Sequence, residues 1–159
     1  MQRYASAVAV VAVLIGAAAP AARGQGAPAH ADAMTAVSAN SITWSDANVP
    51  GFAPGMKIAV VQGNPDSAGL YTLRLTFPDG YRFPPHWHPM AENVTVLSGT
   101  LQVAMGERAD ESKLLAYGPG DYLYIQGTKP HFGGARGSTV IQLHGQGPFA
   151  INVVGGAAK

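Results

Sequence analysis

The chain has 159 residues, the length of one domain, which excludes a second sizeable hydrophobic core. Its 10 lysines and arginines against 9 aspartates and glutamates give a formal charge of +1, too small to indicate nucleic acid or an anionic membrane as a partner. The absence of cysteine excludes a disulfide framework, a thiolate metal site and a cysteine nucleophile.

Residues 1–22 have the pattern of a secretory signal peptide. A basic start at Arg3 precedes an apolar run over residues 5–19, and small residues follow at cleavage spacing. An uncleaved anchor helix is the alternative, but the apolar run is shorter than the roughly 20 residues that span a bilayer. We therefore predict an exported protein, periplasmic or extracellular, with no stable membrane anchor. Residues 23–39, rich in alanine, glycine and proline, are predicted to be a flexible lead-in.

Residues 40–155 are predicted to form a single domain of short β-type runs separated by glycine, proline, asparagine and aspartate. After the leader, no long stripe has the 3.6-residue period of a helix. The β-type runs are residues 41–44, 57–61, 70–77, 93–97, 100–105, 113–117, 121–125, 138–144 and 149–154. Short strands at this spacing indicate an all-β sandwich or small barrel.

A cluster of metal-binding residue types follows the run at 70–77. Prolines at positions 84, 85 and 89 keep this part of the chain extended. In an extended chain His86 and His88 point to the same face, with Cα atoms about 7 Å apart, so both imidazoles can reach one ion. Glu92 has the same parity, and His131 follows a turn that can direct it toward the same cavity. The alternative is that the two histidines are ordinary loop residues and Glu92 a surface charge.

These residues resemble the first motif of the cupin superfamily, in which a glycine, two histidines, a glutamate and a second glycine stand at fixed spacing. Gly80, His86, His88, Glu92 and Gly99 meet every position of that motif. The resemblance implies a double-stranded β-helix, or jelly-roll, barrel over about residues 57–154. It is closest to small exported single-domain bacterial cupins, which have no agreed reaction.

The second cupin motif is only partly met. Gly120 and His131 fit, whereas Gln126, Thr128 and Ala135 stand where the family has proline, glycine and asparagine. These departures concern the geometry of the turn more than the ligand. The resemblance therefore implies a metal held by His131 together with the two histidines and the glutamate of the first motif.

Three histidines and one carboxylate suit one divalent first-row transition metal, Mn, Fe, Co, Ni, Cu or Zn. Calcium is disfavoured because it prefers all-oxygen ligands. A cupin-like site leaves one or two metal positions open for water, dioxygen or a small-molecule substrate.

Arg74 and His144 are the candidate catalytic residues on the substrate side. Residues 138–144 alternate in two sets, and only one set can face the interior. If the set with Gln142 and His144 faces inward, His144 becomes a general base or a partner of the metal ligands; otherwise it faces solvent. Arg74 could anchor a substrate carboxylate, or it could pack its stem on the surface with its head in water.

Two functions remain open for such a site. The first is a metal-dependent enzyme of dioxygenase, isomerase or lyase type acting on a small organic molecule. The alternative is a non-catalytic binding or sensing protein whose metal tethers a ligand or stabilises the fold. A homodimer stays open as well, because the apolar runs at 57–61 and 149–154 could pair between subunits and cupins are often dimers.

Overall fold

The computed structural model describes residues 34–155, and Ala36 onward belongs to one compact unit. The predicted leader and the lead-in as far as residue 33 lie outside the described residues, so the division at residues 22 and 39 stays a prediction. No helix among residues 34–155 is long and apolar enough to cross a membrane.

Residues 34–155 contain nine strands and two short 3-10 helices. The helices are η1 (Ala39–Ser41) and η2 (Glu111–Lys113). The strands are β1 (Ser45–Asp46), β2 (Lys57–Gln62), β3 (Gly69–Phe77), β4 (Arg82–Trp87), β5 (Glu92–Met105), β6 (Leu115–Tyr117), β7 (Tyr122–Ile125), β8 (His131–Gly147) and β9 (Asn152–Val153). The predicted all-β class is confirmed.

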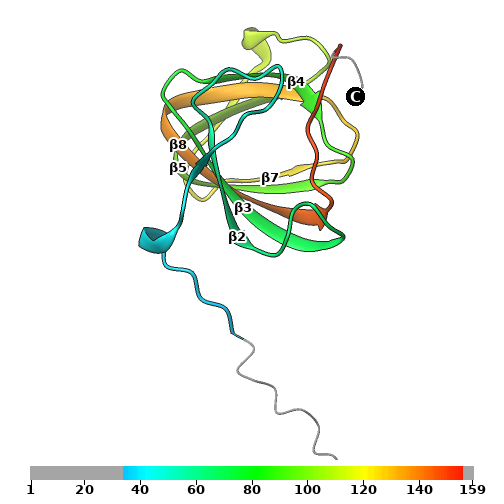
Figure 1. The fold of residues 1–159 in the computed structure, drawn as a ribbon. Helices are drawn as coiled ribbons and strands as arrows, with labels where there is room; N and C mark the ends of the chain where they lie inside the picture. The colour runs from blue at the N-terminus through cyan, green and yellow to red at the C-terminus, as the bar shows by residue number, and fades with distance from the viewer. Residues whose placement is uncertain (1–33, 156–159) are drawn as a thin grey trace, which may run out of the picture. The chain divides into compact units, whose positions relative to one another are not determined.

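A long antiparallel ribbon of β5 and β8 runs through the whole fold (Figure 1). The two halves of the ribbon belong to two sheets. In one sheet the strand order is β1-β2-β3-β8-β5-β7, and in the other it is β9-β4-β8-β5-β6. The curled sheet closes around a common interior, which confirms the jelly-roll barrel.

The ribbon changes sheets at a bend with a clear local cause. Its register shifts on either side of Ser98, and Gly99 and Gly137 both have φ +74, a left-handed conformation that favours glycine. A Cβ atom on Gly99 would collide with the backbone oxygen of Ser138. The fully buried Thr139 closes the bend, because its hydroxyl accepts a hydrogen bond from the N–H of Thr100 at 3.1 Å.

The hydrophobic core is the interior of this barrel. Alternate residues of β3 and β8 point inward, among them Leu73, Leu75, Ile141 and Leu143, and all four are buried. The period-2 pattern of the sequence therefore produces the observed inner face.

Several predicted strand boundaries differ from the structure. The run at 113–117 forms a strand only from Leu115, because Lys113 ends η2, and the run at 149–154 forms only the short β9. The runs at 93–97 and 100–105 form one strand, β5, because the bend at Gly99 keeps the ladder paired. Residues 131–137 extend the run at 138–144 into β8. The run at 41–44 is not a strand: Ser41 ends η1, and residues 42–44 have no regular secondary structure before β1 begins.

Candidate metal centre

Strand β4 places the two histidines of the His-x-His pair side by side. His86 pairs in register with His131 of β8 and with Val153 of β9, and His88 follows the end of the strand. The ring centroids of His86 and His88 are 5.0 Å apart, and both side chains are buried. The extended backbone predicted for this proline-rich segment is confirmed.

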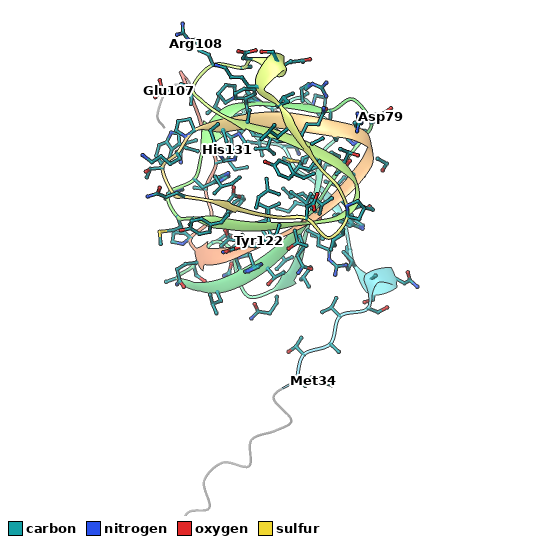
Figure 2. The ribbon with its side chains drawn as sticks, turned by 180° about the vertical axis from the view of Figure 1, so that it is seen from behind. Met34, Asp79, Glu107, Arg108, Tyr122 and His131 are labelled. Carbon is teal, nitrogen blue, oxygen red and sulfur yellow. The ribbon has the colours of Figure 1, made fainter. Side chains whose placement is uncertain are left out.

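Glu92 and His131 reach the same point from opposite ends of the β5–β8 ribbon. Glu92 pairs with Gly145, whereas His131 pairs with Met105 at the other end. The Oε2 atom of Glu92 nevertheless lies 3.2 Å from Nε2 of His88 and 3.6 Å from Nε2 of His131. The structure therefore brings together all four residues that the sequence proposes as ligands. Figure 2 shows the labelled His131 among the side chains that fill the barrel.

Backbone carbonyl oxygens hold the Nδ1 atom of each histidine. The distances are 2.8 Å from His86 to Pro84, 2.8 Å from His88 to Ala150, and 3.2 Å from His131 to Lys129. A carbonyl oxygen only accepts, so each Nδ1 carries the proton and each Nε2 presents a lone pair. This is the tautomer that metal-ligating histidines adopt.

The contact between Glu92 and the histidines requires a positive charge or a proton between them. The Nε2 atoms of His88 and His131 are acceptors in this tautomer, and the facing Oε2 of an ionised Glu92 is also an acceptor. Burial raises the pKa of Glu92 to about 8, since an isolated carboxylate is poorly solvated here. A bound cation would satisfy both the nitrogen lone pairs and the carboxylate.

Burial also keeps the histidines uncharged. It lowers the pKa of His86 to about 3, with the charges of His131 and His88 acting in the same direction. It lowers the pKa of His88 to about 4, again assisted by His131, and it lowers the pKa of His131. At neutral pH three nitrogen ligands are therefore available without loss of a proton.

The donor set fits a first-row transition metal. One nitrogen from each histidine lies within 4.8 Å of the other two, and Glu92 adds a carboxylate oxygen beside them. Imidazole suits Zn, Cu, Fe and Ni, whereas three nitrogen donors do not suit calcium. The residues present can hold such an ion.

The four donors lie on the wall of an otherwise apolar cavity. It leaves about 50 Å³ for the centres of water-sized molecules. Aromatic rings surround the histidines: Phe52 and Phe83 pack edge-on against His86 at 5.0 and 5.5 Å, and Phe149 stacks on His88 at 5.1 Å. The other lining residues are Met56, Leu75, Phe77, Val94, Leu101, Val103, Ile125, Ile141, Leu143 and Ile151.

The structure does not place Arg74 and His144, the predicted catalytic residues, on the wall of the cavity. Neither lines it, because Ile141 and Leu143 are the inward residues of this part of β8. Arg74 lies on the outer face of β3, where its Nε donates a hydrogen bond to Gln142 at 3.1 Å, and His144 is exposed. Because successive side chains of a strand point to opposite faces of the sheet, both residues lie on the side opposite the histidine cluster.

The terminal segments contribute parts of the site that the sequence does not signal. Phe149 covers His88, and the carbonyl of Ala150 accepts its Nδ1–H. Phe52, between β1 and β2, contacts His86. A backbone carbonyl has no sequence signature, and an isolated phenylalanine has little, so only the folded chain identifies these groups.

The turn before His131 has a left-handed residue at the position where the second motif has glycine. Thr128 has φ +63 and stands where the family has glycine, and its N–H donates to the carbonyl of His88 at 2.7 Å. This hydrogen bond joins the turn to the end of the His-x-His segment, and the side chain of His131 lies beside the other three donors.

Comparison with known proteins agrees with this arrangement. The family model described as "Cupin domain" matches residues 73–144, which include all four donors. No curated protein matches the chain in sequence.

Solved structures with the same fold include three bacterial proteins. The polyketide cyclase RemF from Streptomyces resistomycificus has 18% identity and a TM-score of 0.63, covering 78% of this chain and 87% of that one. A putative acetylacetone dioxygenase from Methylibium petroleiphilum PM1 has 15% identity and a TM-score of 0.59, with coverages of 73% and 78%. A cupin-2 domain protein from Rhodospirillum rubrum has 16% identity and a TM-score of 0.54, with coverages of 74% and 74%.

The matched family model, the shared barrel and the convergence of the motif residues at one point lead to a single conclusion: residues 73–144 belong to a cupin domain, and residues 34–155 have the cupin jelly-roll fold.

Proposed function

We propose that this cupin binds one divalent first-row transition metal through His86, His88, Glu92 and His131, and is a metal-dependent enzyme acting on a small organic molecule. The observation that supports it is the convergence of three Nε2 lone pairs and one carboxylate on the wall of an apolar cavity. Dioxygenase, isomerase and lyase reactions all suit such a centre.

The histidines and Glu92 would have different roles in binding the ion. The three neutral imidazoles bind the ion, and the Glu92 carboxylate reduces the charge of the centre and holds His88 and His131 around it. When bound, the ion supplies Lewis acidity and, if it is Fe or Cu, redox chemistry. The apolar wall excludes water, which strengthens every electrostatic interaction at the centre.

The cavity favours a compact, largely apolar ligand with one metal-coordinating oxygen group. The space it leaves for the centres of water-sized molecules is only about 50 Å³, which suits a small ligand. Among its described lining residues only the four donors are titratable, so a second charged group on the ligand would have no partner. The Arg74 guanidinium, on the outer face, is not positioned to supply one.

A non-catalytic binding protein is the second candidate. It is favoured by the same lining, which offers no titratable group for proton transfer apart from the four donors themselves. In this case the metal would hold a ligand without turnover.

Metal analysis tests the proposal. Protein purified from its own compartment is expected to contain about one metal ion per chain, and the double variant His86→Ala/His88→Ala none. His144→Ala is the matched control, because this exposed histidine lies outside the cavity and its loss leaves the metal content unchanged. Full metal content in the double variant would overturn the assignment.

Turnover then separates the two candidates. Oxygen uptake is measured with catechols, thiols and keto acids, and with acetylacetone because one fold neighbour is a putative dioxygenase of that compound. Turnover that disappears in the double variant supports the enzyme. A redox-inert metal with ligand binding but no turnover supports the binding protein.

We also propose export to the periplasm or beyond, on the pattern of residues 1–22. Mass spectrometry of the purified envelope protein is expected to show that Met1 and the leader are missing. An intact Met1 would contradict cleavage.

A further inference from the structure

Tyr71 is a buried tyrosine whose side chain lies close to the metal cavity. It lies on the inner face of β3, and only 2% of its surface is exposed. The inward residues that follow it on the strand are Leu73, Leu75 and Phe77, which are all apolar. A hydroxyl in this row is costly to bury unless it finds a polar partner.

The strand register aligns Tyr71 with Glu92. Tyr71 pairs with Gly145 of β8, and Gly145 pairs with Glu92 of β5, so the three residues form one row across neighbouring strands. Adjacent strands are about 4.8 Å apart, which puts Glu92 two strands from the tyrosine backbone. A long side chain is needed to bridge that gap.

Gly145 leaves room for this bridge. A Cβ atom at Gly145 would lie 3.0 Å from the Tyr71 hydroxyl oxygen and 3.4 Å from its Cζ. The end of the phenol ring therefore lies over the glycine backbone, between β3 and the strand that carries Glu92.

The surroundings hold the phenol in this position and keep it protonated. Its ring packs against Phe149 at 5.6 Å, and Phe149 in turn stacks on His88. Burial, with a contribution from the charge of Glu92, raises the pKa of Tyr71 to about 12. The hydroxyl thus keeps a proton to donate at neutral pH.

We propose that Tyr71 is a positioning residue for Glu92: its hydroxyl donates a hydrogen bond, directly or through one bridging water, to the carboxylate that ligates the metal. This inference rests on the proposed function, because it takes Glu92 as a ligand. Such a partner orients a ligating carboxylate, and its loss typically reduces metal affinity by about 10–100-fold.

The variant Tyr71→Phe tests the role, with Co²⁺ as the probe. Its dissociation constant is measured by chelator competition, and the visible absorption of the bound Co²⁺ reports the ligand arrangement. We expect Tyr71→Phe to weaken Co²⁺ binding by about 10–100-fold and to shift the absorption bands.

Tyr81→Phe is the matched control. Tyr81 is also a buried tyrosine, but its hydroxyl donates to the carbonyl of Ala53 at 2.6 Å. Its loss is expected to lower stability without changing the affinity or the spectrum. Unchanged affinity and spectrum in Tyr71→Phe would overturn the proposal.

A double-mutant cycle shows whether Tyr71 acts through Glu92. In the Glu92→Ala background, which has no acceptor for the tyrosine hydroxyl, Tyr71→Phe is expected to have a much smaller effect on Co²⁺ affinity than in the wild type. An equal effect in both backgrounds would overturn the role assigned here. If the wild type binds no Co²⁺, the proposed function fails as well. If the wild type binds Co²⁺ tightly and Tyr71→Phe binds it with the same affinity, only the role of Tyr71 is overturned.

Gly145→Ala is a second variant, which retains the phenol of Tyr71. It tests the same role if the Tyr71→Phe protein does not fold. The added Cβ would lie 3.0 Å from both the hydroxyl oxygen and the Ala91 carbonyl oxygen, and we expect the end of the tyrosine side chain to shift rather than the backbone. Weakened Co²⁺ binding supports the proposal, and wild-type affinity would contradict it.

Discussion

The Oε2 atom of Glu92 lies 3.6 Å from Nε2 of His131, although Glu92 and His131 lie at opposite ends of the β5–β8 ribbon. The bend at Gly99 and Gly137 makes this approach happen. The convergence of the four candidate metal ligands is thus a consequence of how the ribbon crosses from one sheet to the other.

Replacement of Glu92 by glutamine tests the role of the carboxylate. The amide retains the shape but loses the negative charge, so the metal loses one anionic ligand. We expect affinity to fall by more than the roughly 10–100-fold typical of outer-sphere partners, measured by chelator competition. Glu111→Gln is the control, because Glu111 is exposed and pairs with Arg82 at 3.2 Å on the surface. Equal affinities for wild type and Glu92→Gln would remove the carboxylate from the ligand set.

Metal removal is expected to destabilise the protein. A ligand that binds only the folded state at 100 times its dissociation constant adds about 2.7 kcal/mol, which corresponds to a rise of roughly 5–10 °C in the unfolding midpoint. Calorimetry before and after chelation measures this difference. The His86→Ala/His88→Ala variant should show no such response, and a similar shift in that variant would indicate binding elsewhere.

Truncation of the cavity wall should cost stability. Leu143 is 2% exposed and lines the cavity, so Leu143→Ala is expected to lower the free energy of unfolding by about 2–5 kcal/mol in urea titrations. Leu70, on the neighbouring strand β3, is 72% exposed, and Leu70→Ala should stay within about 0.5 kcal/mol of wild type. Equal losses in both variants would contradict the assignment of the inner face.

Replacement of Thr128 by glycine should stabilise the turn before His131. A β-branched residue at φ +63 carries strain of about 1–3 kcal/mol, and the exposed side chain contributes little packing in return. Allowing for the greater unfolded-state freedom of glycine, we expect a net gain of about 1 kcal/mol in urea unfolding. Thr128→Ala retains the Cβ atom and is expected to gain less. A glycine variant less stable than wild type would show that the threonine side chain makes a favourable contribution that its exposure does not suggest.

The sequence alone determined the fold class, and it predicted the four candidate donors. Short β-type runs between turn residues specify an all-β chain, since strand alternation and turn chemistry are local properties. The prolines around His86 and His88 specify an extended backbone, and the spacing to Glu92 identifies the first cupin motif. Local geometry is sufficient for each of these predictions.

The tertiary structure decided which faces point inward and what surrounds the donors. Alternation divides the run at 138–144 into two sets but does not say which one meets the core, and the structure turns Arg74 and His144 away from the cavity. Tyr71 approaches Glu92 only through the register of three strands. Such contacts join residues far apart in the chain, so they depend on the bend and pairing of the whole sheet, which no local pattern encodes.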